Sequence, residues 1–418
     1  MAKILSLKLL NAIGVILCFA SPSWAEVRMI TTTGEYRMGD HDTRADAKRI
    51  ALQDAKRLAL EKAGTYLESI TEIKNFQLGR DEIRAYTAGV VEVTEQQTRS
   101  TMEGETTVVR VDMICRIDSD VVTRQIDALR KNETVKAELL QARQETDRLR
   151  KELDAKTREL SAVTSKTETE TIAQARRKVL TGQDVNSLLT QAWVALGGSG
   201  GSLTASSSSI EGRRRARGLI EQALALDTSN SDVHERMGVL LAEEGNLEGA
   251  IAEFRTAIRL KPDDARAHNN LGIVLKAKGD LEGAITAYRT AIGLKPDEAL
   301  AYNNLGNALT AKGDLEGAIA AFRTAIRLQP DDADVHYNLG VALYDKGDLE
   351  GAITAYRTAI RLQPDHAGAH YALGIALKDK GRRVEATREF REYLRLTPTT
   401  PENRLHKEHV RVLLRELE

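Results

Sequence analysis

Apolar residues in the second half of the chain recur at the i, i+3, i+4, i+7 spacing of amphipathic helices, and the whole pattern repeats every 34 residues. The period is marked by Pro262, Pro296, Pro330, Pro364 and Pro398. Self-similarity at this period is typical of stacked helical hairpins. Residues 231–400 are therefore predicted to form five two-helix units, which begin at Ser231, Ala265, Ala299, Ala333 and Ala367.

Small and aromatic residues occupy fixed positions in these units, counted so that the proline is position 32. Positions 7 and 8 carry Leu-Gly pairs, or Met237-Gly238 in the first unit, and position 24 is always Phe or Tyr. This pattern resembles the tetratricopeptide repeat. The resemblance implies a mostly α-helical chain whose C-terminal part is an α-solenoid, with the first helix of each repeat lining a concave surface.

Residues 26–117 alternate between strand and helix patterns, which predicts a small α+β N-terminal module. Strands are expected at 27–31, 90–98 and 106–117. Between them, Thr43 and Asp46 have the spacing of a capping box, and alanines on one helical face follow as far as Gly64, which suits a helix end. Cys115 falls on the apolar face of the last strand, so we expect a buried thiol rather than a reactive one.

Three stretches of this module carry a resemblance. The segment Ala45–Leu52, followed by Asp81–Ile83 and Ala88–Val93, resembles the N-terminal domain of the flagellar T-ring protein and related small outer-membrane lipoproteins. The resemblance covers about ninety residues and rests on apolar patterns without invariant chemistry. It implies a location in the bacterial cell envelope and says nothing of a mechanism.

Residues 118–186 are polar, favour helix and contain no proline. Positions three and four apart form a weak heptad seam: Leu139, Ala142, Thr146, Leu149, Leu153, Leu160 and Val163. Because Thr146 and Lys156 interrupt the apolar seam, the predicted long helix is either a marginal coiled-coil dimer or a solitary helix that packs on its own chain. A straight helix of this length would separate its ends by roughly 90 Å and act as a spacer.

Two shorter segments flank the five repeats. Residues 187–230 read as a degenerate repeat, in which a segment around Trp193 matches a first helix and Ala216–Leu226 matches a second. A Gly/Ser-rich insertion after Leu196 is expected to be a flexible loop between them. Residues 401–418 have apolar positions among charges and are predicted to form the capping helix that a solenoid needs at its end.

Residues 1–25 have the features of a secretory signal peptide. Two lysines precede the apolar run Leu9–Ala20, and small residues follow, so cleavage is expected after Ala25. A retained anchor helix is the alternative, although the run is short for a bilayer. Leu17 before Cys18 argues against lipid attachment. The sequence therefore predicts an exported protein, periplasmic in a bacterium, whose mature chain can form no internal disulfide.

Charge and composition narrow the function classes. The 418 residues include 60 Lys and Arg against 61 Asp and Glu, so no overall basic field favours nucleic acid as a partner. Residues 213–217 contain four arginines, which we interpret as a solvated helix face, with docking of an acidic partner as the alternative. No nucleophile–base pair or nucleotide fingerprint occurs, so we expect no enzymatic activity and no cofactor.

Two motifs could be mistaken for chemical sites. The Gly-Asp-Leu-Glu-Gly sequences at Gly279, Gly313 and Gly347 resemble phosphate-binding loops, but their order fits a helix turn in which the aspartate caps the second helix. The pairs His366/His370 and His406/His409 have helical spacings suited to a metal, yet no carboxylate completes a known set. We interpret His370 as a packing residue and expect no metal site.

The predicted concave surface carries the strongest functional signal. Position 6 reads Arg236, Asn270, Asn304 and Asn338 in successive units, and such side chains, facing solvent, could pair with both groups of a peptide backbone. This spacing resembles the asparagine row in the repeats of the O-linked N-acetylglucosamine transferase, which implies that an extended chain is held and implies nothing about glycosyl transfer. The neighbouring candidates are Asn269, Asn303, Asn307, Tyr337, Tyr344, Tyr371, Lys276 and Lys378.

Two functional hypotheses follow. In the first, the protein is a non-catalytic exported scaffold whose repeat groove binds an extended protein segment, while the N-terminal module docks to an envelope assembly. In the second, the N-terminal module and the helical arm build an oligomeric structural component of the envelope, and the repeats stack on one another. Both hypotheses name protein partners, and both allow a weak homo-oligomer through the coiled coil.

Overall fold

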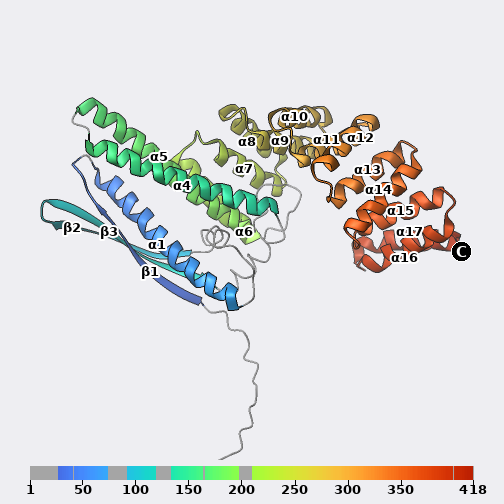
Figure 1. Cartoon of the computed structure of the whole chain (residues 1–418), viewed down its shortest axis with the longest axis horizontal. Coiled ribbons are helices and arrows are strands. Elements are labelled where there is room, and N and C mark those ends of the chain that lie inside the picture. The colour runs from blue at the N-terminus through green and yellow to red at the C-terminus, as the bar shows by residue number, and fades with distance from the viewer. Residues whose placement is uncertain are drawn as a thin grey trace, which may run out of the picture.

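The computed structural model describes residues 27–40, 42–73, 92–118, 133–162, 165–196, 210–398 and 400–417. A sheet with one long helix comes first, a pair of long helices second, and a curved array of short helices last (Figure 1). The chain is mostly helical, as predicted. The expected signal peptide, the Gly/Ser-rich insertion and residues 81–91 of the envelope-module motif lie outside the described residues. No described helix has the length and apolar character needed to span a bilayer.

The N-terminal sheet has three antiparallel strands in the order β1-β3-β2, formed by β1 (Val27–Arg37), β2 (Glu92–Glu103) and β3 (Thr106–Asp118). Helix α1 (Arg44–Ile73) lies across β1 and β3. Its first turn is capped as expected, because the Thr43 hydroxyl accepts the Asp46 N–H at 3.1 Å. The predicted end at Gly64 is wrong, since α1 continues for nine more residues.

Small residues let α1 approach the sheet closely. Five of its alanines, from Ala47 to Ala63, are buried against the alternating apolar residues of β3. These include Cys115, and burial raises the pKa of its thiol. Gly34 of β1 lies at the closest approach: a Cβ atom there would be 2.0 Å from the Ala51 carbonyl oxygen. The cysteine is therefore a core residue, as predicted, and the alanine stripe sets the distance between helix and sheet.

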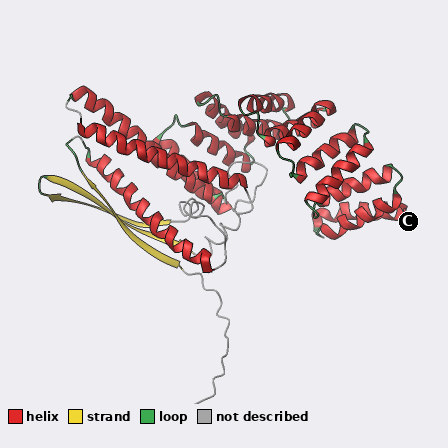
Figure 2. Cartoon of the chain, in the orientation of Figure 1, coloured by secondary structure: helices red, strands yellow, loops and turns green. Residues whose placement is uncertain are grey.

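The segment predicted as one long helix forms a helical hairpin instead. Helix α4 (Glu133–Ala162) ends, and α5 (Lys166–Ala195) returns alongside it (Figure 2). Leu153 of the predicted seam is buried against Val179 and Leu180 of α5. The spacer of roughly 90 Å is therefore wrong, and the seam packs on its own chain, as the second alternative proposed.

Polar contacts fasten α5 to the N-terminal module. Arg176, which is 1% exposed, forms an ion pair with Asp42. The Tyr36 hydroxyl donates to the same carboxylate at 2.9 Å, and burial together with Asp42 raises the pKa of Tyr36 to about 12. About two turns further along α5, Asp184 pairs with Arg49 of α1 at 2.8 Å. Helix α5 is thus an integral part of the N-terminal unit rather than a free arm.

The C-terminal array consists of helices joined by short turns. Its helices are α6 (Ile210–Leu226), α7 (Ser231–Glu243), α8 (Leu247–Leu260), α9 (Ala265–Lys278), α10 (Leu281–Leu294), α11 (Ala299–Lys312), α12 (Leu315–Leu328), α13 (Ala333–Asp345), α14 (Leu349–Leu362), α15 (Ala367–Asp379), α16 (Arg383–Leu396) and α17 (Pro401–Leu417). The end of α5 packs with α6 and α7 in one apolar cluster. Since Trp193 and Val194 near that end also belong to the core of the N-terminal module, α5 joins the two parts.

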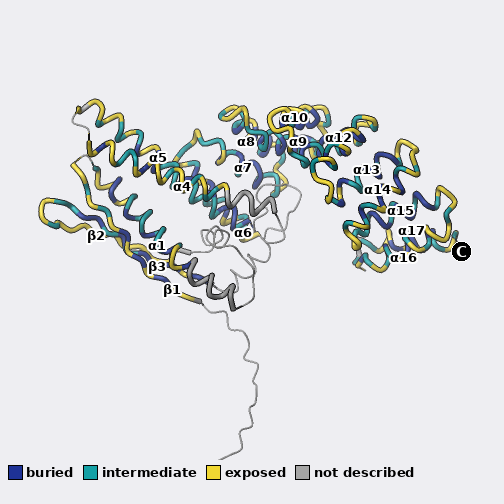
Figure 3. Tube along the Cα trace, viewed as in Figure 1, coloured by how far each residue is buried: buried dark blue, intermediate teal, exposed yellow. Residues whose placement is uncertain are grey.

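Each repeat uses the same packing. The position-8 glycine of the first helix faces the position-24 ring of the second, and the buried residues form a continuous layer through the array (Figure 3). Near the helix ends, a lysine in each of the last four repeats pairs with a glutamate of the preceding repeat, as between Lys312 and Glu282 at 3.2 Å. Helix α17 closes the array with Val410 and Leu413 buried. Adjacent repeats are therefore joined by both an apolar layer and ion pairs.

Candidate protein-binding groove

The first helices of the repeats line the inner side of the array. Successive first helices, α7, α9, α11, α13 and α15, contact one another more closely than successive second helices do. The row of first helices is therefore the concave side of the curve seen in Figure 1. All twelve residues predicted for the groove lie on these five helices.

The position-6 asparagines bond to the preceding repeat. Asn304 donates from its Nδ2 to Oδ1 of Asn269 at 3.1 Å, and Asn338 donates to Asn303 at 3.0 Å. Each bond links position 6 of one repeat to position 5 of the repeat before it, 35 residues earlier. We call these bonds the asparagine rungs. They hold neighbouring first helices in register on the concave side.

The rungs correct the prediction that these asparagines face solvent. Asn270 is fully buried, and Asn269 and Asn304 are 7% and 8% exposed. Asn303 and Asn338 are only partly buried. Because most of their hydrogen-bonding groups are buried between helices, the asparagines contribute to repeat stacking, and the surface open to a partner is formed by other residues.

Three partly exposed tyrosines lie on the first helices of the last two repeats. Tyr337 packs on the ring of His366 with centroids 5.0 Å apart, and Tyr371 packs on His406 of α17 at 5.2 Å. Both tyrosines are partly exposed. Tyr344 donates its hydroxyl to Asp379 at 2.5 Å, a bond that raises the pKa of Tyr344 to about 12. These rings are held in place by their neighbours, which lowers the entropy lost on binding.

Cations lie near both ends of the groove. Lys276 on α9 is partly buried, and this burial lowers the pKa of its ammonium. Lys378 on α15 is likewise only partly exposed. Arg236 begins the row on α7, where it lines a cleft of about 700 Å³ that Trp193 of α5 also lines. The helical hairpin thus forms one wall at the N-terminal end of the groove.

A buried carboxylate completes the first rung, and sequence reasoning missed it. Glu235 is 3% exposed and accepts from Asn270 at 3.1 Å and from Arg266 at 2.5 Å. Burial raises the pKa of Glu235 although the guanidinium lies beside it. Asp232 and Asp264 also lie near Glu235. Glu235 precedes Asn270 by 35 residues, the same offset that separates the two asparagines of each other rung. This offset is the sequence signal that could have identified Glu235.

The two motifs that resemble chemical sites are structural. Gly279 takes the left-handed conformation with φ of 92°, and Asp280 caps α10 by accepting the Gly283 N–H. His370 bonds to the Pro364 carbonyl oxygen and to Glu389, and its pKa is raised by the Glu389 carboxylate. These groups are engaged within the repeat, as the packing interpretation predicted.

The four arginines of residues 213–217 lie on α6. Arg214 and Arg215 are exposed, while Arg217 pairs with Glu244 of the next helix. The segment is thus a charged helix face with one arginine used in packing. Docking of an acidic partner at this face stays a prediction.

A sequence profile described as "TPR repeat" matches residues 238–279, 274–311, 306–347 and 342–381. These segments coincide with the helices α7 to α15 and their turns. The C-terminal part of the chain is therefore an array of tetratricopeptide repeats. No curated protein matches the chain significantly. The resemblance of the N-terminal module to the T-ring protein is not among these matches.

Solved structures of several repeat proteins resemble the array. The crystal structure of MamA is 29% identical over 38% of this chain and 94% of that chain, with a TM-score of 0.37. YrrB, described as a TPR protein with an unusual peptide-binding site, is 20% identical over 46% and 97%, with a TM-score of 0.39. PilF of Pseudomonas aeruginosa is 19% identical over 56% and 99%, with a TM-score of 0.47.

Proposed function

We propose that this protein is a non-catalytic scaffold that holds an extended protein segment along the inner face of its repeats. The observation that carries the proposal is the set of partly exposed, pre-positioned tyrosines on that face, Tyr337, Tyr344 and Tyr371. Tyrosine and tryptophan dominate the energetically important positions of protein interfaces. Three such rings on the neighbouring helices α13 and α15 suit a segment that runs across the last two repeats.

Lys276 adds a polar contribution to the same surface. Its pKa is lowered because burial disfavours the charged ammonium in the free protein. A carboxylate or backbone carbonyl of a bound segment would offset that cost. The groove therefore suits a segment with apolar or aromatic side chains near α13 and α15 and an acceptor group near α9.

The groove is tested by recovering partners from a host extract and measuring their affinity by calorimetry. Replacing Tyr337 and Tyr371 together by Ala should weaken binding about 30-fold or more, since loss of an interface anchor costs about 2 kcal/mol or more. Lys276→Glu should also weaken binding, whereas Arg289→Glu at an exposed position of the second helix α10 serves as the matched control. If the parent and the three variants bind the partner with equal affinity and melt at the same temperature, the groove is not the binding site.

We further propose that the protein is exported through residues 1–25 and works in a periplasmic compartment. A basic start, a short apolar run and small residues before position 26 support this proposal. Export predicts a mature chain that begins at Glu26, which N-terminal sequencing of protein from the host would detect. A chain isolated from the host with Met1 still present would contradict export by cleavage.

A further inference from the structure

The two edges of the N-terminal sheet differ. Strand β2 pairs with β3 on one side only, and every residue from Val93 to Met102 is exposed. Helix α1 packs on β1 and β3, and among the described residues its contact with β2 is at most marginal. Within the described residues, no group outside β3 bonds to the backbone of β2. The strand therefore presents an open row of N–H and C=O groups, which is a template for pairing with another strand.

The edge of β1 is blocked by contrast. Lys62 of α1 donates to the Thr31 carbonyl oxygen at 2.9 Å, and Asp54 of α1 accepts the Glu35 N–H at 3.4 Å. These side chains occupy backbone groups that a further strand would need. Strand β2 contains neither proline nor lysine, two residues that commonly protect an edge, and its register shift between Val93 and Glu95 lies before the segment from Glu95 to Arg99. A further strand that joins this sheet would therefore pair with β2 and not with β1.

The charges along β2 select one partner strand. Opposite residues in antiparallel strands lie on the same face, so pairing two copies of β2 with Gln97 facing Gln97 sets Glu95 against Arg99 twice. If the two-fold axis lies at Glu95 or at Arg99 instead, two residues away, the two copies of that residue lie opposite each other and like charges repel. Only the register centred on Gln97 matches the charges.

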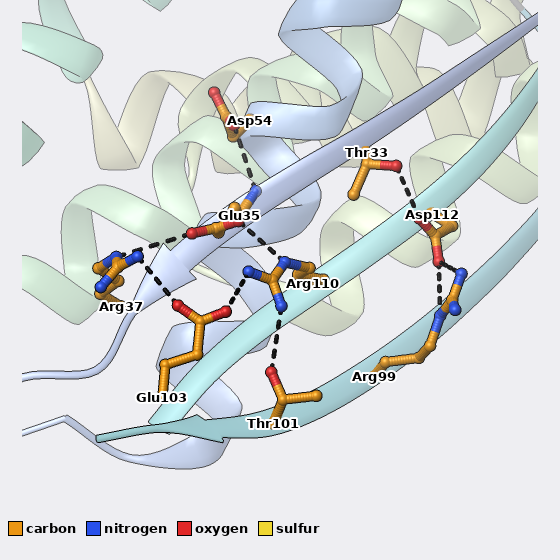
Figure 4. A network of polar contacts seen from close by, with 9 residues as sticks. All are labelled: Thr33, Glu35, Arg37, Asp54, Arg99, Thr101, Glu103, Arg110 and Asp112. Atoms are coloured by element: carbon orange, nitrogen blue, oxygen red, sulfur yellow. Dashed lines mark hydrogen bonds and ion pairs between the residues drawn. The ribbon is translucent and has the colours of Figure 1, made fainter. Parts of the chain in front are cut away.

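We propose that β2 of one molecule pairs antiparallel with β2 of a second copy about a two-fold axis at Gln97, joining two sheets into one of six strands. Arg99 already holds Asp112 on the solvent face of the sheet, as Figure 4 shows. Both bonds reach the same carboxylate oxygen, so other guanidinium N–H groups are available to Glu95 of the second copy. Glu95 has no partner among the described residues. This contact is independent of the repeat groove.

Cysteine cross-linking tests the register directly. The full chain with Cys18→Ser and Gln97→Cys should form a covalent dimer under mild oxidation, because directly opposite Cα atoms lie within disulfide range. Gln96→Cys is the matched control. In the proposed register position 96 lies opposite position 98 of the second copy, and its side chain is on the other side of the sheet, so the two introduced cysteines do not meet. The remaining Cys115 is buried. Equal cross-linking of the two variants, or none, would overturn the proposal.

Sedimentation of the full chain provides the second measurement. The parent should dimerise at micromolar concentrations, and Glu95→Arg should weaken the dimer at least about tenfold, because two attractive pairs become repulsive. Glu105→Arg in the β2–β3 turn is the matched control and should leave dimerisation unchanged. Circular dichroism confirms that each variant is folded. A monomeric parent, or a dimer unaffected by Glu95→Arg, would show that this edge is not the interface.

Discussion

At the scale of single residues, the repeat array depends on a contact between a glycine and an aromatic ring. A Cβ atom at Gly306 would lie 2.5 Å from Cε1 of Phe322, and the equivalent contact recurs in all five repeats. The ring is buried and cannot move without displacing the neighbouring helix. The absence of a side chain at position 8 therefore sets how closely the two helices of a repeat approach.

We predict that Gly306→Ala destabilises the array by about 1–3 kcal/mol, the usual cost of overpacking a dense core. Gly293→Ala is the control, because no atom lies within 4 Å of its Cβ position and alanine favours helix there. Urea denaturation followed by circular dichroism would separate the two variants. The explanation fails if Gly306→Ala unfolds at the same urea concentration as Gly293→Ala.

At the scale of elements, the sequence pattern did not predict that the long helical segment folds into the α4–α5 hairpin. The heptad seam identified Leu149, Leu153 and Leu160 as positions that pack, but a seam does not specify its partner. Neither proline nor glycine marks the end of α4. Ser165 with Glu168 has capping-box spacing and was the available signal for a new helix, although the Ser165 side chain forms no capping bond.

The hairpin predicts a specific intramolecular cross-link. A Cβ at Gly182 lies 3.7 Å from Leu149 Cδ1, so in the double variant Leu149→Cys/Gly182→Cys a short thiol-reactive cross-linker should join the two cysteines within one chain. In a single straight helix these positions would be roughly 50 Å apart. Mass spectrometry of the digested monomer would identify the cross-linked peptide. Cross-linking found only between chains would favour the coiled-coil dimer instead.

The repeats were predictable because the residues that determine each helical hairpin lie close together in the sequence and recur every 34 residues. Each unit carries its own glycine and ring, three of the five also carry a capping aspartate, and five copies of a pattern average out local ambiguity. The N-terminal strands were found from alternation, yet the docking of α5 on α1 was not. Arg176 and Asp42 are separated by 134 residues, and neither belongs to a repeated sequence motif. No sequence pattern therefore connects the two.

At the scale of the whole molecule, α5 belongs to two cores. Its middle is fastened to α1 by ion pairs, and its end packs with α6 and α7 at the start of the array. The N-terminal module is thus held against the N-terminal end of the groove instead of being separated by a spacer. In the proposed scaffold, a bound segment and whatever the sheet contacts would be kept at a fixed separation.

The asparagine rungs test whether the inner face serves the fold or a partner. Replacing Asn270, Asn304 and Asn338 together by Ala removes three hydrogen bonds between repeats, each worth about 0.5–1.5 kcal/mol, and also deprives buried Glu235 of a donor. We therefore expect the triple variant to lose about 2–4 kcal/mol of stability, with a clearly lower melting temperature.

Asn307 is the matched control for this prediction, because it lies on the same helix as Asn304 and forms no rung. Asn307→Ala should melt like the parent, and any effect on partner binding would then report the accessible surface alone. Melting curves of both variants, paired with calorimetry on a recovered partner, separate the two roles. If the triple variant melts like the parent but binds weakly, the asparagines are partner contacts after all, because rungs that stack the repeats cannot be removed without loss of stability.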